Sequence, residues 1–137
     1  MFTVVGGSGF IGTRLCSLLE ERGLDFEIVD LKSSGRFPER TQIADIRDIE
    51  ALRKAVTGNA IINLAAVHRD DVRDRSEYYS TNVDGTRNLC EVASEKGIAT
   101  MVFTSTVAVY GFCAPETDES GTLNPFNDYG RSKMQAE

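Results

Sequence analysis

The 137-residue sequence predicts an α/β fold, in which helices cover both faces of a parallel, doubly wound sheet. Short apolar runs alternate with segments whose apolar residues recur at helical spacing, and parallel strands need crossovers of this kind. The length fits one domain, residues 1–137, with a sizeable core. Apolar residues make up 41% of the chain and charged residues 26%, as is ordinary for a globular protein.

The opening residues predict the first strand and the first helix. Residues 2–5, FTVV, are short, apolar and β-branched, which is typical of a buried strand. The next segment carries apolar residues at helical spacing, and Gly23 ends it as a helix C-cap would. The apolar residues of this helix are Ile11, Leu15, Leu18 and Leu19.

The middle of the chain repeats the alternation twice. A second strand is predicted over 26–30, a Gly/Ser/Pro-bearing loop over 31–40 and a short third strand over 42–45. Residues 60–66 form an apolar run broken only by Asn63, which is typical of a strand covered on both faces. Between the third and fourth strands, a helix face is formed by Ile49, Leu52, Ala55 and Val56.

The second half begins with a polar stretch and a long helix. The sequence RDDVRDR, residues 69–75, is predicted to be a solvated charged surface. A helix over 78–96 follows, then a fifth strand over 101–104 and a long loop over 107–128. A final helix begins near Tyr129. The residues expected to face inward from the long helix are Val83, Thr86, Leu89, Cys90 and Ala93.

Charge and cysteine content exclude several classes of protein. A net charge of −6 argues against nucleic-acid binding. No apolar stretch approaches the length of a membrane span, and no basic segment of a signal peptide precedes the first strand. Cys16, Cys90 and Cys113 lack C-x-x-C spacing, which favours buried or idle thiols in a reducing cytoplasm over disulfides. His68 is the only histidine, so we expect no metal site built from histidines.

Three glycines separate the first strand from the first helix. Gly6, Gly9 and Gly12 would permit a tight turn, close approach of a ligand and packing of the helix on the strand. A pyrophosphate could then meet the free N–H groups of the helix N-terminus. Asp30, eighteen residues after Gly12, ends the next strand and could accept hydrogen bonds from ribose hydroxyls. Because its charge would repel a 2′-phosphate, the pattern favours NAD over NADP.

A tyrosine and a lysine lie four residues apart at the start of the final helix. Tyr129 and Lys133 of YGRSK therefore share one helix face. A phenol is a poor base at neutral pH because its usual pKa is about 10, and a nearby ammonium favours the phenolate. Residues 104–111, TSTVAVYG, place small hydroxyls at the end of the fifth strand, where parallel sheets bind ligands.

In order, these motifs resemble the extended short-chain dehydrogenase/reductase family, and within it the NAD-dependent nucleotide-sugar epimerases and dehydratases of the UDP-glucose/UDP-galactose 4-epimerase type. The resemblance implies a Rossmann-type sheet, an NAD cofactor and a nucleotide-sugar substrate. It covers the whole chain and rests on G-x-x-G-F-I-G at 6–12, Asp30, ADI at 44–46, NLAA at 63–66, NVDGTRNL at 82–89, STVAVYG at 105–111 and YGRSK at 129–133.

The resemblance also implies roles for individual residues. Thr106, four residues before Tyr110, would be the catalytic hydroxyl, Tyr129 the acid/base, and Lys133 the residue that holds the nicotinamide ribose. Asn82 would help to hold the strand ends and the cofactor, and an approach of His68 to the cofactor is left open. The implied cofactor-binding residues are Gly6, Gly9, Phe10, Ile11, Gly12, Asp30, Asp45, Ile46, Leu64, Ala65, Ala66, Asn82, Tyr129 and Lys133. Asp45 and Ile46 would flank the adenine.

The residues after Thr106 distinguish subfamilies. Val107 and Ala108 stand where related dehydratases and decarboxylases carry acids, and neither can transfer a proton. The resemblance therefore implies an epimerase, which oxidises the sugar transiently at C4 and returns hydride to the opposite face. An NAD-linked sugar-nucleotide reductase or dehydrogenase and a non-catalytic NAD-binding module are the alternatives.

The final helix is short for this family. Glu137 lies only about two turns into it, and no sequence follows for a substrate domain. We therefore expect the chain to be the N-terminal, cofactor-binding portion of a longer cytoplasmic enzyme and to be inactive alone. In the longer protein, helix 78–96 and the final helix would pair across a homodimer interface.

Overall fold

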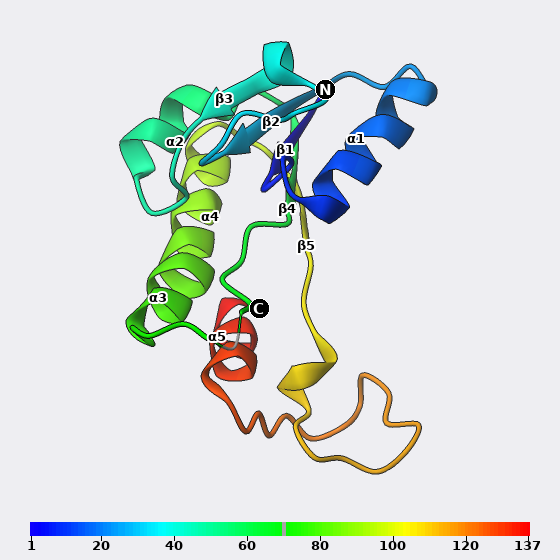
Figure 1. The fold of residues 1–137 in the computed structure, drawn as a ribbon, viewed down its shortest axis with the longest axis vertical. Coiled ribbons are helices and arrows are strands. Elements are labelled where there is room, and N and C mark those ends of the chain that lie inside the picture. The colour runs from blue at the N-terminus through cyan, green and yellow to red at the C-terminus, as the bar shows by residue number, and fades with distance from the viewer. Residues whose placement is uncertain (70) are drawn as a thin grey trace.

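A computed structural model describes residues 1–69 and 71–137. Five parallel strands form one sheet in the order β3-β2-β1-β4-β5, and Figure 1 shows helices on both of its sides. The predicted doubly wound α/β fold is therefore confirmed. The strands are β1 (Phe2–Val5), β2 (Phe26–Asp30), β3 (Thr41–Ile43), β4 (Ala60–Asn63) and β5 (Thr100–Phe103), and the helices are α1 (Phe10–Glu21), α2 (Ile49–Ala55), α3 (Ser76–Tyr79), α4 (Gly85–Glu95) and α5 (Asp128–Ala136).

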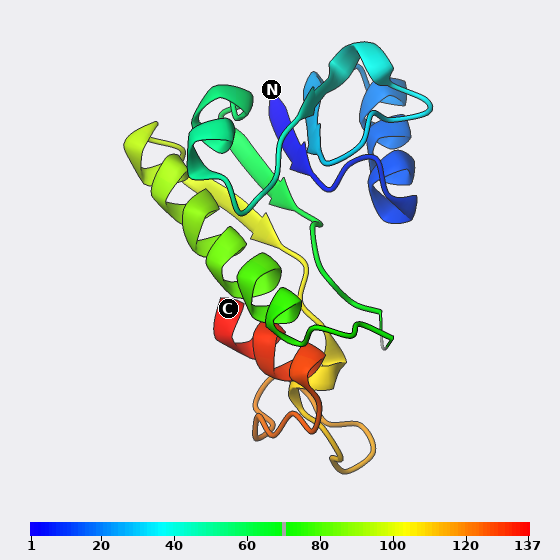
Figure 2. The same cartoon turned by 60° about the vertical axis from the view of Figure 1, so that its left-hand side comes forward.

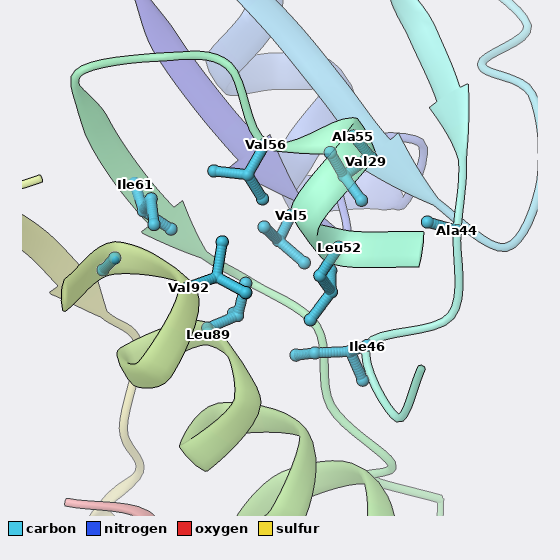
Figure 3. Close-up of a cluster of buried hydrophobic side chains, with 11 residues drawn as sticks. Val5, Val29, Ala44, Ile46, Leu52, Ala55, Val56, Ile61, Leu89 and Val92 are labelled. Atoms are coloured by element: carbon cyan, nitrogen blue, oxygen red, sulfur yellow. The ribbon is translucent and has the colours of Figure 1, made fainter. Parts of the chain in front are cut away.

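The two faces of the sheet bury alternate residues of each strand. Val4 and Ile28 pack with Cys16 of α1 on one face, while Val5 and Val29 point to the other face, because side chains alternate along a strand. Figure 3 shows this second cluster, in which the strand residues meet side chains from α2 and α4. The helix side chains that it labels are Leu52, Ala55, Leu89 and Val92.

Helix α1 buries a narrower stripe than its apolar spacing predicts. Gly12, Cys16 and Leu19 are its buried residues, whereas Ile11 is 63% exposed and Leu18 is 42% exposed. These two residues lie about 80° or more around the helix from every residue of the stripe. Burial also raises the pKa of the Cys16 thiol to about 11, in keeping with an idle core thiol.

Helix α4 corrects one predicted core position. Cys90 is exposed, and the buried position is Val92, which lies on the same stripe as Leu89. A π-helix over Ser80–Asp84 joins α3 to α4. Figure 2 shows the joined helices running past the sheet, with α5 beside their N-terminal part.

Strand ends differ from the predicted ranges by a few residues. The predicted strand over 60–66 pairs only over β4, because the chain leaves the sheet after Leu64 N–H donates to Val5 O at 2.8 Å. The long loop after β5 contains a short 3-10 helix at Val107–Val109. In the stretch 69–75, the charged side chains at 69, 71 and 73–75 are exposed as predicted, and Asp70 lies outside the described residues.

Within residues 1–69 and 71–137, no helix is both long enough and apolar enough to cross a membrane.

Candidate functional site

A cleft of about 650 Å³ opens at the carboxyl ends of the strands. It collects residues from every strand end and from the start of α5, as expected for an open parallel sheet. The predicted site residues that line it are Gly6, Gly9, Phe10, Ile11, Gly12, Asp30, Asp45, Ile46, Leu64, Ala65, Ala66, Tyr129 and Lys133. The two predicted site residues outside this lining are Asn82 and Thr106.

The glycine turn forms one wall of the cleft, and it has no room for side chains. Gly6 has a φ of 78°, and a Cβ there would lie 2.7 Å from the backbone nitrogen of Ala65. A Cβ on Gly12 would clash with the backbone of Gly7. Gly9 is the N-cap of α1 and has no side chain that could cap the helix, so the first N–H groups of α1 can meet a ligand.

Asp30 ties the glycine turn to the end of β2. Its Oδ2 accepts a hydrogen bond from Ser8 N–H at 3.0 Å, and its Oδ1 accepts one from Lys32 N–H at 3.2 Å. The hydroxyl of Ser8 in turn donates to Lys32 O at 2.8 Å. The carboxylate therefore sits beside the turn at the cleft edge, where a ribose could reach its remaining acceptor positions.

Asp45 forms an ion pair inside the cleft lining. Arg47 Nε lies 3.0 Å from each carboxylate oxygen, and Arg47 Nη2 lies 2.6 Å from Oδ2. The hydrogen bonds from Arg47 lower the pKa of Asp45 below its usual value, and the same contacts raise the pKa of Arg47. The pair keeps an oriented carboxylate and a guanidinium at the β3 end of the cleft.

Tyr129 and Lys133 of α5 both line the cleft, and residues four apart share a helix face, as their spacing predicts. Lys133 is only 1% exposed, and its Nζ lies 3.8 Å from the centroid of the Phe103 ring. Removal from water lowers the pKa of Lys133 to about 8, and the charge of Glu137 opposes this effect. The ring face of Phe103 stabilises the ammonium that burial disfavours.

The hydroxyls at the end of β5 are arranged differently from the sequence expectation. Thr104 and Ser105 line the cleft. Thr106 is half-buried, and its Oγ1 accepts a hydrogen bond from Ala108 N–H at 3.2 Å, which caps the following 3-10 helix. Ser105 donates to the carboxylate of Glu137, the C-cap of α5. The catalytic role of Thr106 stays a prediction.

Asn82 lies behind the cleft wall. It is 1% exposed and exchanges two hydrogen bonds with the backbone of Val67, which itself lines the cleft. It thus holds the chain at Val67, beyond the end of β4, and the role predicted for it at the strand ends and the cofactor stays a prediction.

Several cleft residues were not predicted from the sequence. Arg47 has a local signal, because an acid and an arginine two residues apart can pair across a turn. The sequence left open whether His68 approaches the cofactor. In the structure His68 lines the cleft and is exposed. Gly7 lies outside the cleft lining, and a Cβ there would lie 2.9 Å from the side chain of Ile28, a contact that only the tertiary structure shows. Among the described residues, no group of three or more His, Cys, Asp or Glu side chains is placed to hold a metal ion.

Comparisons with known proteins agree with this geometry. The chain is 47% identical to an N-acetyl-alpha-D-glucosaminyl-diphospho-ditrans,octacis-undecaprenol 4-epimerase of Escherichia coli O157:H7, over 98% of this chain and 40% of the relative. It is 36% identical to a UDP-glucose 4-epimerase of Rhizobium meliloti (strain 1021), over 98% of this chain and 44% of the relative. The chain therefore spans less than half the length of these relatives.

A solved structure shares the fold. A short-chain dehydrogenase/reductase superfamily protein from Agrobacterium tumefaciens, crystallised with bound NAD, superposes with a TM-score of 0.90 at 31% identity. The match covers 99% of this chain and 42% of that one. A family model for the NAD dependent epimerase/dehydratase family matches residues 2–137. Because that match spans nearly the whole chain, the protein belongs to the NAD dependent epimerase/dehydratase family.

Proposed function

We propose that this chain is the NAD-binding portion of a 4-epimerase that acts on a sugar carried by a diphosphate. The proposal rests on one observation, that the glycine turn after β1 and the start of α5 line the same cleft. The glycine turn and Asp30 line one end, and Tyr129 and Lys133 line the other. A nucleotide-binding turn and a base beside a buried ammonium are the parts that hydride transfer with proton transfer requires.

The cleft fits a dinucleotide. The backbones at Gly6 and Gly12 pack where a Cβ would collide, so the turn stays narrow beneath the uncapped start of α1. That helix end suits a pyrophosphate. Asp30 would hold the adenine ribose, Asp45 and Ile46 would flank the adenine, and Lys133 would hold the second ribose. When bound, NAD would supply a reversible hydride acceptor.

The residues of α5 and β5 would handle the proton. Tyr129 would accept the proton of the sugar 4-hydroxyl during oxidation and return it after the keto-sugar has turned over. The Lys133 ammonium is held against the ring of Phe103, one helical turn from Tyr129. Thr106 would orient the sugar oxygen by a hydrogen bond. Val107, which is 83% exposed, and Ala108 carry no acid for water elimination, which supports epimerase over dehydratase chemistry.

The relatives narrow the substrate to two kinds of sugar diphosphate. The 47% identical relative is named for a sugar joined through diphosphate to undecaprenol, and the 36% identical relative for UDP-glucose. The higher identity favours a polyprenyl diphosphate sugar, whereas the sequence motifs led us to expect a nucleotide sugar. Both substrates share the sugar, its 4-hydroxyl and the diphosphate.

The test uses the full-length protein that contains this chain. We expect it to interconvert the C4 epimers of N-acetylglucosaminyl-diphospho-undecaprenol, of UDP-N-acetylglucosamine or of UDP-glucose, measured by NMR of the sugar protons. Tyr129→Phe should abolish turnover while NAD still binds by calorimetry. Tyr110→Phe is the matched control, since Tyr110 is outside the cleft lining. Near-normal turnover by Tyr129→Phe would show that the assigned base is wrong.

Absorbance recorded during the same reaction distinguishes an epimerase from a dehydrogenase or reductase. An epimerase regenerates NAD in each cycle, so absorbance at the NADH wavelength should show no net change. Stoichiometric NADH formation or consumption would indicate a dehydrogenase or reductase. NAD binding without turnover of any of the three substrates would indicate a binding module.

A further inference from the structure

Ser132 is a buried hydroxyl between the two residues assigned to proton transfer. It follows Tyr129 by three positions, precedes Lys133 and is 0% exposed. Its Oγ donates to Tyr129 O at 2.8 Å, and it accepts a hydrogen bond from Asn82 Nδ2 at 2.9 Å. One hydroxyl therefore holds the first turn of α5 and joins α5 to a helix that lies 50 residues earlier in the chain.

The partner of Ser132 has no freedom to turn. The Oδ1 of Asn82 accepts from Val67 N–H at 2.8 Å, and its Nδ2 donates to Val67 O at 3.0 Å. Because one backbone residue supplies both a donor and an acceptor, the orientation of the amide is determined, and both Nδ2 hydrogens are used. Asn82 lies in the π-helix Ser80–Asp84, and π-turns often occur at functional sites.

A second buried asparagine supports the same stretch of cleft wall. Asn63 Oδ1 accepts from Ala65 N–H at 3.1 Å, and its Nδ2 donates to Thr86 Oγ1 at 3.2 Å. The wall over residues 64–67 is thus anchored twice to the helices behind it. Of these two asparagines, only Asn82 is also hydrogen-bonded to α5 among the described residues, through Ser132.

We propose that Ser132 is a positioning residue, which locks the Tyr129–Lys133 face of α5 to the cleft wall at Val67 through Asn82. The path runs from Tyr129 O through Ser132 and Asn82 to Val67, entirely by hydrogen bonds between 2.8 and 3.0 Å. The expected effect of this link on turnover rests on the proposed function. Its effect on the stability of α5 and of the cleft wall does not.

The chemistry of the site explains why a serine is needed. An alanine would leave one N–H of Asn82 without a partner in a buried place, which is unfavourable. A displacement of reacting groups by about 1 Å can slow an enzyme roughly a hundredfold. A lost link between α5 and the cleft wall would therefore reduce turnover more than it reduces cofactor binding, because the glycine turn that would hold the pyrophosphate lies on a different element.

The variants isolate the hydroxyl. Ser132→Ala removes both hydrogen bonds, and Ser132→Thr retains a hydroxyl. In Ser132→Cys the thiol is close in size to the hydroxyl and forms weaker hydrogen bonds, so this variant should give an intermediate result. It replaces Ser132→Thr if the extra methyl group of threonine prevents folding. Ser17→Ala is the matched control, because the Ser17 hydroxyl donates to Thr13 O at 2.8 Å within α1, a bond that stays inside one helix.

The first measurement is hydrogen–deuterium exchange of the 137-residue chain, which needs no substrate. Ser132→Ala should raise exchange roughly tenfold in residues 64–69 and in α5 together, and Ser17→Ala should change neither segment. Ser132→Thr or Ser132→Cys should restore part of the protection. Unchanged exchange over 64–69, or faster exchange in α5 alone, would overturn the proposal.

The second measurement is steady-state kinetics of the full-length enzyme. At a temperature where the variant remains folded, Ser132→Ala should lower kcat roughly tenfold to a hundredfold, with NAD affinity near that of the parent and with recovery by the hydroxyl-bearing variant. A kcat within twofold of the parent, or a loss of kcat that follows the loss of folded protein, would overturn the proposal. If the parent enzyme itself shows no epimerisation, the proposed function fails, and the exchange measurement alone decides the role of Ser132.

Discussion

Lys133 shows at the scale of one residue how function and stability oppose each other. Its ammonium is 1% exposed and rests on the ring of Phe103 rather than in water. Burial disfavours the charged form, which is why its pKa falls to about 8. At neutral pH the folded chain must still carry this buried charge, and folding is weakened by it.

We expect Lys133→Met to stabilise the chain while removing the role proposed for Lys133 at the active site. A lysine with a pKa near 8 when folded and 10.5 when unfolded binds fewer protons in the folded state between these values. Stability of the parent therefore rises with pH across that window. The gain in melting temperature by the methionine variant should be largest below pH 8 and shrink toward pH 10.5.

Thermal unfolding of both proteins at pH 6.5 and pH 10 checks this expectation. Lys54→Met, at an exposed position of α2, is the control for loss of a surface charge. A gain that is the same at both pH values would contradict the assigned cause.

Asp30 determines the expected choice between dinucleotides. A 2′-phosphate placed beside its carboxylate would be repelled by about 1 kcal/mol in water-like surroundings at 4 Å, and by more at lower dielectric. We expect NAD to bind roughly tenfold more tightly than NADP, with Lys32 and Arg36 nearby in sequence softening the difference. Calorimetric titration of both cofactors measures it.

Asp30→Asn should narrow this preference, because the amide oxygen keeps one acceptor for the turn while the charge is removed. Equal affinities of the unaltered chain for NAD and NADP would remove Asp30 from its assigned role.

At the scale of one element, the glycine turn uses its glycines for two different purposes. At Gly6 a Cβ would meet the backbone of Ala65 at 2.7 Å, and φ is positive. At Gly9 the nearest atom is Gly6 O at 3.3 Å, and φ is −74°. The fold itself needs a glycine at position 6, whereas position 9 can take a methyl group if Gly6 O shifts by a few tenths of an ångström.

Two alanine variants therefore should separate stability from binding. Gly6→Ala should lower the unfolding free energy by about 1–2 kcal/mol or more, since it adds left-handed strain to a clash. Gly9→Ala should unfold near the parent value and lose NAD affinity roughly tenfold or more. Urea unfolding and calorimetry measure the two effects, and a Gly9→Ala variant with full NAD affinity would contradict close approach at that position.

For the whole molecule, one cleft collects the glycine turn and Asp30, which we propose bind the cofactor, and Tyr129 and Lys133, which we propose serve proton transfer. The chain spans 40% and 44% of two curated relatives. We expect the 137-residue chain to bind NAD and to be catalytically silent, because most groups that would grip the sugar and its diphosphate are expected in the rest of the longer protein, and without them the rate advantage of fixed proximity would be lost. Calorimetry tests NAD binding, and the NMR assay tests for turnover. Turnover by this chain alone would contradict the expectation.

Association is the second property of the whole molecule. We expect the 137-residue chain to be monomeric, because α5, over Asp128–Ala136, is too short to bury together with α4 the apolar area that a stable dimer needs. The longer protein should form a homodimer through α4 and a longer α5. Light scattering of both proteins measures this, and a monomeric longer protein would contradict the pairing.

The sequence by itself determined the alternation of strands and helices, the glycine turn and the acid at the end of β2. These are local signals: apolar periodicity reports which residues form an element, and glycine reports where the backbone is crowded. Tyr129 and Lys133 could be predicted for the same reason, since residues four apart share a helix face wherever the helix lies.

The tertiary structure alone decided which faces are buried and what supports the cleft. Leu18 and Cys90 fit an apolar spacing and are exposed, because the neighbouring sheet and helices cover narrower stripes. Phe103 beneath Lys133 and Asn82 beneath Ser132 join residues 30 and 50 positions apart. No periodic pattern encodes such pairs, because each depends on where two separately formed elements come to rest against each other.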